Sequence, residues 1–255
     1  MCPLLGAHYI DLFLRCNTRT HQYSFDQIVL PGDQERFIHV PSSPEHDLIE
    51  ISPDIRHSLT DIGLEVSTGP VVDFRLKEYL RQTPGKDTVP LLYHAHFAGQ
   101  SVAWPKLGMK KPNAIVRNGE TEKWLYPTGC YVVVKRFSSK EEKRRLVATV
   151  IYPRHFKSSM LGLENHLNVF HSGRKGIPQD VARGLALFLN STQVDEQFRR
   201  FSGHTQVNAT DLRLLKYPSR ETLAGFGAWA SSNGQLTQGD IDHKIESLSC
   251  QKATT

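Results

Sequence analysis

The segment from Leu185 to Pro218 constrains the fold of this chain most, because it joins a periodic apolar pattern to a dense polar loop. Apolar residues recur at steps of three to five positions, which predicts one buried face of a helix that begins near Pro178 and ends at Ser202-Gly203. Proline suits a first helical turn because its missing amide hydrogen is not needed there. The residues with this spacing are Val181, Leu185, Phe188, Leu189, Val194, Phe198 and Phe201. A helix with such a face packs on a core, so the loop after it should be held in place.

That loop carries five hydrogen-bonding side chains within seven residues: His204, Thr205, Gln206, Asn208 and Thr210. Polar groups at this density need partners, either in a network that fixes the end of the helix or outside the domain. Both roles stay open. His204 and Thr205 directly follow the expected helix end and favour the structural role, whereas Gln206 and Asn208 favour an external contact.

Several segments carry a resemblance to a known family. The helix end LxxFLNS (185–191) and the segment GHTQVNATDLRxLxYP (203–218) resemble the C-terminal part of the target recognition domain of adenine-specific DNA methyltransferases from restriction–modification systems. The specificity subunits of type I systems have a looser version of the pattern. The same resemblance extends to LEVSTGPVVDFR (64–75), VPLLYHAHF (89–97), WPKLGMKKPNAI (104–115), GCYVVVKRFSSKEEKRR (129–145) and LENHLNVFH (163–171). It therefore covers about Asp26 to Leu223.

The resemblance implies an α+β fold, namely a mixed, twisted β-sheet recognition domain with a few packed helices. Such a domain reads double-stranded DNA, while a separate Rossmann-like domain binds S-adenosylmethionine. We expect an N-terminal remnant or linker (1–25), a DNA target recognition domain (26–225) and a polar tail (226–255) that is flexible.

The distribution of charge agrees with an anionic partner. The whole chain has 31 basic and 26 acidic residues, a net charge of only +5, but residues 135–145 alone hold six basic and two acidic residues. This segment also contains Ser138 with Glu141, and Ser139 with Glu142, either of which predicts a capping box that opens a helical turn. A charged segment of this kind is often only a solvated face, and the resemblance is what favours contact with DNA.

Four groups of residues are candidate DNA contacts. Ser67, Thr68 and Gly69 offer hydroxyls and a backbone amide to a phosphate, although a plain turn explains them equally well. An aromatic and basic loop offers a ring, ammonium groups and an amide, although it also fits a solvated lysine loop. This loop contributes Trp104, Lys106, Lys110, Lys111 and Asn113. The basic segment contributes Lys135, Arg136, Ser138, Ser139, Lys140, Lys143, Arg144 and Arg145. The last group is Asn165, His166 and Asn168, with His204, Thr205, Gln206 and Asn208 of the polar loop, since asparagine can bond adenine bidentately in the major groove.

The family's catalytic motifs are missing from these 255 residues. Neither a glycine-rich cofactor loop after a strand nor an Asn-Pro-Pro-Tyr-like motif for the flipped adenine is present. We therefore expect a detached or truncated recognition half with no catalytic or cofactor-binding residue. S-adenosylmethionine would be bound by a partner or missing catalytic domain or subunit, and we expect this chain alone neither to bind it nor to transfer a methyl group.

Other classes of function remain as alternatives. Pro53-Asp54 and Glu141-x-Lys143 are elements of a metal-dependent restriction endonuclease, but they lie 87 residues apart. His94 and His96 are spaced to share one face of a strand, but no third metal ligand is evident, and we expect no metal site. The third alternative is a nucleic-acid-binding module unrelated to methyltransferases, for example one that binds RNA. This sequence lacks the aromatic strand motifs that are usual in RNA-binding modules.

Cysteine usage and hydropathy bear on location. Cys2, Cys16, Cys130 and Cys250 lie far apart without CxxC spacing, which is typical of a reducing compartment. There is no run of about 18 apolar residues and no basic leader, so we expect a cytoplasmic protein without a membrane partner.

Overall fold

The computed structural model describes residues 9–12, 21–29, 54–98, 101–139, 141–202 and 205–250. At the N-terminus, strand β1 (Tyr9–Leu12) pairs antiparallel with β2 (His21–Ser24), and helix α1 (Phe25–Ile28) follows β2 directly. Residues 30–53 lie outside the described part of the chain.

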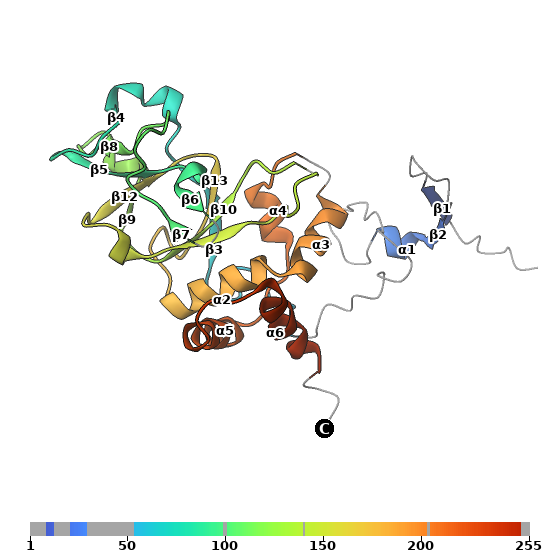
Figure 1. Ribbon diagram of the computed structural model, residues 1–255. Coiled ribbons are helices and arrows are strands. Elements are labelled where there is room, and N and C mark those ends of the chain that lie inside the picture. The colour runs from blue at the N-terminus through green and yellow to red at the C-terminus, as the bar shows by residue number, and fades with distance from the viewer. Residues whose placement is uncertain are drawn as a thin grey trace, which may run out of the picture.

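Two larger sheets form the centre of the structure (Figure 1). One is antiparallel, with strand order β11 (Ala148–Ile151), β10 (Tyr131–Lys135), β13 (Leu167–His171) and β3 (Glu65–Thr68). The other has the order β4 (Leu80–Arg81), β8 (Ala114–Val116), β5 (Thr88–Leu92), β12 (Met160–Leu163) and β9 (Leu125–Pro127). It is mixed, because β5 and β12 run parallel and its other pairs are antiparallel. Strands β6 (Phe97–Ala98) and β7 (Ser101–Val102) pair beside these sheets.

Strand β10 shows why the sheets stack. Its side chains alternate between two cores, as the period of two in a strand requires. Val132 and Val134 face a core shared with the helices, whereas Tyr131 and Val133 face a core shared with the five-stranded sheet. A third cluster lies farther out and includes Leu91 and Ile115 of the five-stranded sheet. The four-stranded sheet is therefore a middle layer between helices and a second sheet.

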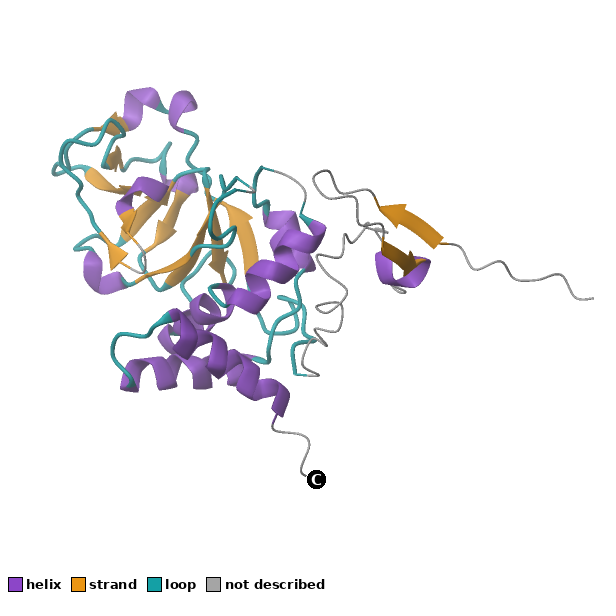
Figure 2. Cartoon of the chain, turned by 45° about the vertical axis from the view of Figure 1, so that its right-hand side comes forward, coloured by secondary structure: helices purple, strands orange, loops and turns teal. Residues whose placement is uncertain are grey.

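Helices cover the outer face of the four-stranded sheet (Figure 2). They are α2 (Gln179–Leu189), α3 (Thr192–Phe201), α4 (Ala209–Leu214), α5 (Arg220–Ser232) and α6 (Gln238–Cys250). Shorter 3-10 turns η1 (Asp73–Arg75), η2 (Lys77–Tyr79), η3 (His94–His96), η4 (Glu122–Trp124) and η5 (Pro153–His155) lie in the connections between strands. The expected α+β class is confirmed.

The single helix expected from Pro178 to Ser202 is two helices. The chain breaks at Asn190 and Ser191, where the Ser191 side chain accepts a hydrogen bond from the amide of Val194 and caps α3. The Asn190 side chain bonds both the N–H and the C=O of Ala148, so it satisfies the open edge of β11. The apolar stripe still faces one core, because Val181, Leu185, Phe188, Val194 and Phe198 are all buried there.

Residues 226–255 differ from the flexible polar tail that their composition suggested. The described part, up to Cys250, completes α5 and forms α6, and Ile241 and Ile245 of α6 are buried in the helix-side core. The Asp242 carboxylate accepts hydrogen bonds from the Thr192 amide and hydroxyl at the start of α3. Two isoleucines four residues apart thus anchor a helix that is otherwise polar.

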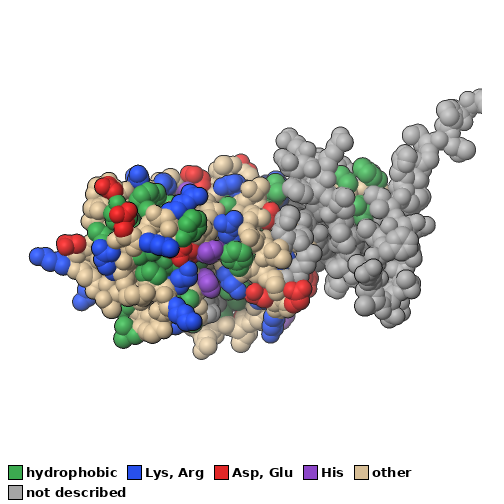
Figure 3. Space-filling model, turned by 90° about the horizontal axis from the view of Figure 1, so that it is seen from above, with side chains coloured by type: hydrophobic (Ala, Val, Ile, Leu, Met, Phe, Trp, Pro, Cys, Tyr) green, Lys and Arg blue, Asp and Glu red, His purple; other side chains and the backbone are tan. Residues whose placement is uncertain are grey.

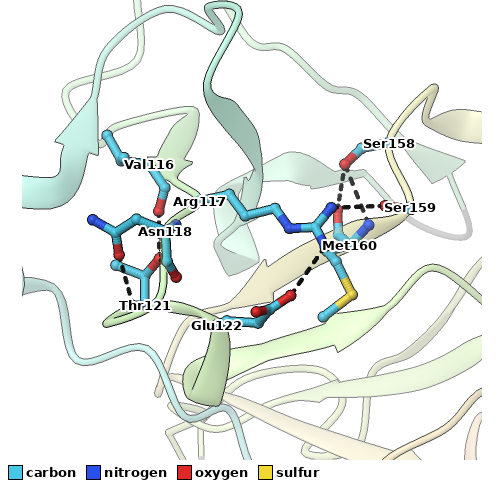
Figure 4. Close-up of polar contacts among 8 residues, drawn as sticks. All are labelled: Val116, Arg117, Asn118, Thr121, Glu122, Ser158, Ser159 and Met160. Atoms are coloured by element: carbon cyan, nitrogen blue, oxygen red, sulfur yellow. Dashed lines mark hydrogen bonds and ion pairs between the residues drawn. The ribbon is translucent and has the colours of Figure 1, made fainter.

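A polar network builds the connection between β8 and β9 (Figure 4). The Thr121 side chain is fully buried, and its hydroxyl donates to the carbonyl of Val116 at 2.7 Å. Arg117 donates to the Ser159 hydroxyl and to the Glu122 carboxylate, both at 3.0 Å. These contacts tie the β8–β9 loop to the start of β12 and need no ligand. In the described ranges, no helix is long and apolar enough to cross a membrane.

Candidate nucleic-acid interface

The connections that follow β3, β5, β7, β10 and β12 meet on one surface. We call this surface the loop face and define it by Asp73, His94, Lys111, Lys135, Arg136, Phe137 and His166. Lys111 forms an ion pair with Asp73 at 2.6 Å, and the ring of Phe137 lies 4.9 Å from that of His166. Burial lowers the pKa of His94, and the nearby Lys135, His166 and Lys111 lower it further. Seen from above, histidine side chains lie among Lys, Arg and hydrophobic side chains (Figure 3).

Carboxylates anchor part of this basic surface. Burial acts to raise the pKa of Asp73, but its hydrogen bond with Lys111 and the charge of Lys111 hold the pKa below its usual value. The ammonium of Lys135 lies 3.2 Å from the Glu142 carboxylate. These cations are therefore held in position by partners that also reduce the net charge of the surface.

Two contacts with Glu164 fix the position of His166. Its Nδ1 lies 2.6 Å from Oε1 of Glu164, and its backbone amide donates to Oε2 of the same carboxylate at 3.0 Å. Glu164 is completely buried, and burial raises the pKa of its carboxyl against the opposing effect of His166. The imidazole itself remains one-third exposed. A buried carboxylate thus fixes the orientation of a histidine that reaches the surface.

The basic segment 135–145 divides between surface and interior. Lys135 and Arg136 lie on the loop face, and Arg136 Nη1 donates to the carbonyl of Asn165 at 3.3 Å. Arg145, expected to contact phosphate, is only 1% exposed, and its guanidinium donates to the carbonyls of Ser202 and Gln206. Its role is therefore structural, and the basic surface is weaker than the sequence count suggests.

Asp195 of α3 explains why the backbone at Arg145 is drawn into the interior. Its Oδ1 accepts hydrogen bonds from the backbone amides of Arg145 and Leu146, both at 2.7 Å. Its Oδ2 accepts from Nε of Arg199 at 2.8 Å. The β10–β11 connection is thereby fixed to α3.

The expected capping box forms only in part. The Ser139 amide donates to the Glu142 carboxylate at 3.3 Å, but residues 141–145 form turns and bends without a helix. Ser138 is buried and bonds the carbonyls of Arg144 and Thr205, so phosphate contact does not fit it. Ser139, Lys143 and Arg144 remain partly or fully exposed candidates, and Lys140 lies outside the described residues.

The Ser67-Thr68-Gly69 turn is occupied by the protein itself. The Ser67 hydroxyl bonds the Tyr126 hydroxyl and His171 Nε2. The Gly69 amide donates to the carbonyl of Leu167 at 2.8 Å, and a Cβ here would lie 2.3 Å from the carbonyl oxygen of Glu164. Gly69 is therefore required for close packing, and neither Ser67 nor Gly69 fits the expected phosphate contact. Thr68 is half-buried on β3 opposite Asn168.

The aromatic and basic loop is organised by a buried asparagine. The Asn113 side chain accepts from His96 Nε2 and from the Lys106 amide, and it donates to the carbonyls of Gln82 and Lys106. Trp104 Nε1 donates to the Asn113 carbonyl. Asn113 is 3% exposed, so its amide holds the loop together and does not fit a base contact.

The lysines of this loop are at the surface. Lys106 Nζ donates to the carbonyl of Ala95, beside His94, and so borders the loop face, while Lys110 is exposed. His94 and His96 lie on the 3-10 turn η3 instead of one strand face. His96 is buried, and the Tyr93 amide donates to its Nδ1, so Nε2 carries the proton that bonds Asn113.

The polar loop after α3 is mainly structural where it is described. Asn208 forms a capping box with Asp211 at the start of α4, so its side chain does not fit the expected external contact. Buried Asn168 donates to the carbonyl of Val207 at 2.7 Å, which also accounts for its position. Thr205 is exposed and Gln206 half-buried, and both stay candidates through their side chains. His204 lies outside the described residues, and Asn165 is half-buried beside His166.

Phe137, Glu164, Asp73 and Asp195 were not among the residues predicted from the sequence, and His94 was weighed only as a metal ligand, which was not expected. An aromatic residue directly after Lys135-Arg136 was an available signal for Phe137. The buried carboxylates gave no such signal, because only the fold shows that they lie beneath basic residues. Among the described residues, no cluster of three or more His, Cys, Asp and Glu is positioned to hold a metal ion.

The connection from β13 to α2, which contains Gly173 and Gly176, does not fit the glycine-rich loop of an S-adenosylmethionine site. A Cβ at Gly176 would lie 2.9 Å from the backbone of Gly129 and Cys130, so this glycine serves close chain packing. Pro178, which has no amide hydrogen to donate, then precedes α2. This connection offers no open cradle for a cofactor.

Over most of its length the chain is similar to type II methyltransferases. It is 55% identical over 231 residues to type II methyltransferase M.BsuBI of Bacillus subtilis, which is 90% of this chain and 46% of the relative. It is 43% identical over 230 residues to type II methyltransferase M.PstI of Providencia stuartii, which is 90% of this chain and 45% of the relative. The chain thus spans about half the length of the curated relatives it matches. No family model matches it.

Proposed function

We propose that this chain is the DNA target recognition part of an adenine-specific methyltransferase of a restriction–modification system, and that its loop face contacts double-stranded DNA. The observation that carries the proposal is the gathering of His94, Lys111, Lys135, Arg136 and His166 on one surface. These residues come from separate connections of two stacked sheets. The similarity to type II methyltransferases supports DNA as the proposed partner of this basic surface.

The chemistry of the loop face suits a duplex. Lysine and arginine neutralise phosphates and position the protein, while side chains between them reach base edges. Methyl transfer would need a catalytic domain or subunit that binds S-adenosylmethionine, because these 255 residues lack the glycine-rich loop and the Asn-Pro-Pro-Tyr-like motif. The role proposed for this chain is therefore to hold the DNA in register.

A pair of charge reversals tests the proposal. Arg136→Glu changes the loop face, whereas Lys86→Glu makes the same change in charge before β5, at the opposite end of that strand from His94. We expect fluorescence anisotropy with a labelled duplex to show weaker binding for Arg136→Glu and nearly unchanged binding for Lys86→Glu. Affinity of the wild-type chain should fall with salt, with a log–log slope of about −0.9 per phosphate contacted.

Two results would count against the proposal. One is a folded wild-type chain that binds no duplex at low salt. The other is an equal loss of affinity in the two variants, because that would show attraction by overall charge without a defined surface.

A further inference from the structure

Phe137 is an exposed aromatic ring on a fixed backbone. It is 44% exposed, although the chain around it continues the ladder of β10. The Arg136 amide donates to the carbonyl of His166 at 2.9 Å, and the Val207 amide donates to the carbonyl of Arg136 at 2.7 Å. Phe137 itself forms an isolated antiparallel β-bridge with Gln206. The exposed part of the ring is therefore presented on a backbone that hydrogen bonds fix, where it is available for a contact outside this chain.

The ring of Phe137 packs on the imidazole of His166, with centroids 4.9 Å apart and planes tilted by 42°. The Glu164 carboxylate fixes the orientation of that imidazole, since Oε1 of Glu164 lies 2.6 Å from Nδ1 of His166. When Glu164 is ionised its carboxylate can only accept a hydrogen bond, so the ring proton is then on Nδ1. The other ring nitrogen, Nε2, is then an acceptor whenever the imidazole is neutral.

We propose that Phe137 and His166 act as one unit that contacts an A·T base pair in the major groove, and that Glu164 positions this unit. The inference rests on the proposed function. Phe137 would contact the thymine 5-methyl group, and His166 Nε2 would accept a hydrogen bond from the adenine N6 amino group. A G·C pair has an amino donor on cytosine but no methyl group beside it, so the two contacts together distinguish A·T.

The surrounding charges support this placement. Lys135 and Arg136 directly precede Phe137 and can hold flanking phosphates, which would bring the ring to the groove. The carboxylate beneath His166 is completely buried, so its charge is kept away from the phosphates. A rigid pair with a fixed acceptor has the preorganisation that a specific contact requires.

The test uses the full chain and a duplex selected by it from a random pool. Each thymine in that duplex is replaced in turn by deoxyuridine, which lacks only the methyl group. We expect one such replacement to weaken binding by the wild type about tenfold and binding by Phe137→Ala no further. Replacing the paired adenine by purine, which lacks the amino group, should likewise have no effect on His166→Ala.

Phe74→Ala is the matched control, because Phe74 is 63% exposed and packs against Arg75 instead of His166. It should keep the full sensitivity to deoxyuridine. For the positioning role, Glu164→Gln keeps an acceptor for Nδ1 and should retain discrimination between adenine and purine, whereas Glu164→Ala should lose it. Thermal melting of each variant checks that it is folded.

The outcomes separate the inference from the proposed function. If the wild type binds no duplex, the proposed function fails and this inference with it. If the wild type selects a sequence but Phe137→Ala keeps the same response to deoxyuridine, the inference alone is overturned. Retained discrimination by folded Glu164→Ala would overturn the positioning role.

Discussion

Arg145 shows how burial changes the role of a charged side chain. It stands in the most basic segment of the sequence, yet its guanidinium lies over the Phe198 ring and donates to two backbone carbonyls. Sequence analysis could count its charge but could not show that Asp195, 50 residues later, would draw its backbone inward. Exposed residues of the same segment, such as Lys143, kept the surface position expected of them.

Arg145→Leu should destabilise the fold, because the carbonyls of Ser202 and Gln206 would lose a donor in the interior. We expect the free energy of unfolding to fall by about 2–4 kcal/mol. Lys143→Leu, on the exposed turn, should change it by less than about 0.5 kcal/mol. Urea unfolding followed by circular dichroism measures both. A fully stable Arg145→Leu that binds DNA weakly would show that Arg145 contacts DNA after all.

Buried histidines predict how stability depends on pH. Burial lowers the pKa of His96 and of His171 below 6.5, so the folded chain binds these protons less readily than the unfolded chain does. The contribution of these two histidines to the free energy of unfolding is complete above pH 6.5. It is lost as the pH falls from 6.5 through the lower pKa of the folded state. Glu164 acts in the opposite sense, because its raised pKa favours proton uptake by the folded state.

We therefore expect the free energy of unfolding to decrease with falling pH below 6.5, and to decrease less steeply in His96→Gln. The comparison of slopes removes the contribution of all groups that the two proteins share. Denaturant unfolding at a series of pH values provides the measurement. Parallel curves for the two proteins would mean that His96 titrates alike in the folded and unfolded states.

At the scale of elements, the contact between α2 and α5 depends on two glycines. A Cβ at Gly184 would lie 1.8 Å from the carbonyl oxygen of Leu223, and one at Gly227 would lie 1.8 Å from that of Asp180. Because these neighbours are backbone atoms of the facing helix, the helices would have to separate to accept a methyl group. The sequence showed these glycines only as residues unfavourable in helices.

Gly184→Ala should therefore lower the free energy of unfolding by about 1–3 kcal/mol despite the better helix propensity of alanine. Gly225 is the control: it lies in the same helix as Gly227, but nothing lies within 4 Å of an added Cβ. Gly225→Ala should raise the free energy of unfolding by about 0.5–1 kcal/mol. Two stabilised variants would contradict the close helix contact.

Much of the element pattern could be predicted, and the failures have local causes. The apolar run in β10 and the stripe along α2 and α3 were visible because periodicity survives in the sequence. The break at Asn190 was missed because the partner of its side chain is Ala148, on a distant strand. Helix α6 was missed because Ile241 and Ile245 are few apolar residues in a polar segment.

At the scale of the whole molecule, the loop face could be predicted only in part. The charge pattern predicted Lys106, Lys111, Lys135 and Arg136, and the asparagines beside it predicted His166, but only the stacking of two sheets brings these separate segments together. Asn113, Asn168 and Asn208 resemble base-reading residues in the sequence, yet the side chain of each bonds the protein's own backbone. Side chains that can bond a base edge bond a peptide group equally well.

The central claim is that this chain by itself recognises a DNA sequence. Repeated selection of bound duplexes from a random pool tests it directly, with sequencing of the pool and affinity measurement at physiological salt. We predict that one short motif is enriched and that the chain binds it about a thousandfold more tightly than unselected duplex. A folded chain that enriches no motif, or binds all duplexes with equal affinity, would contradict the account.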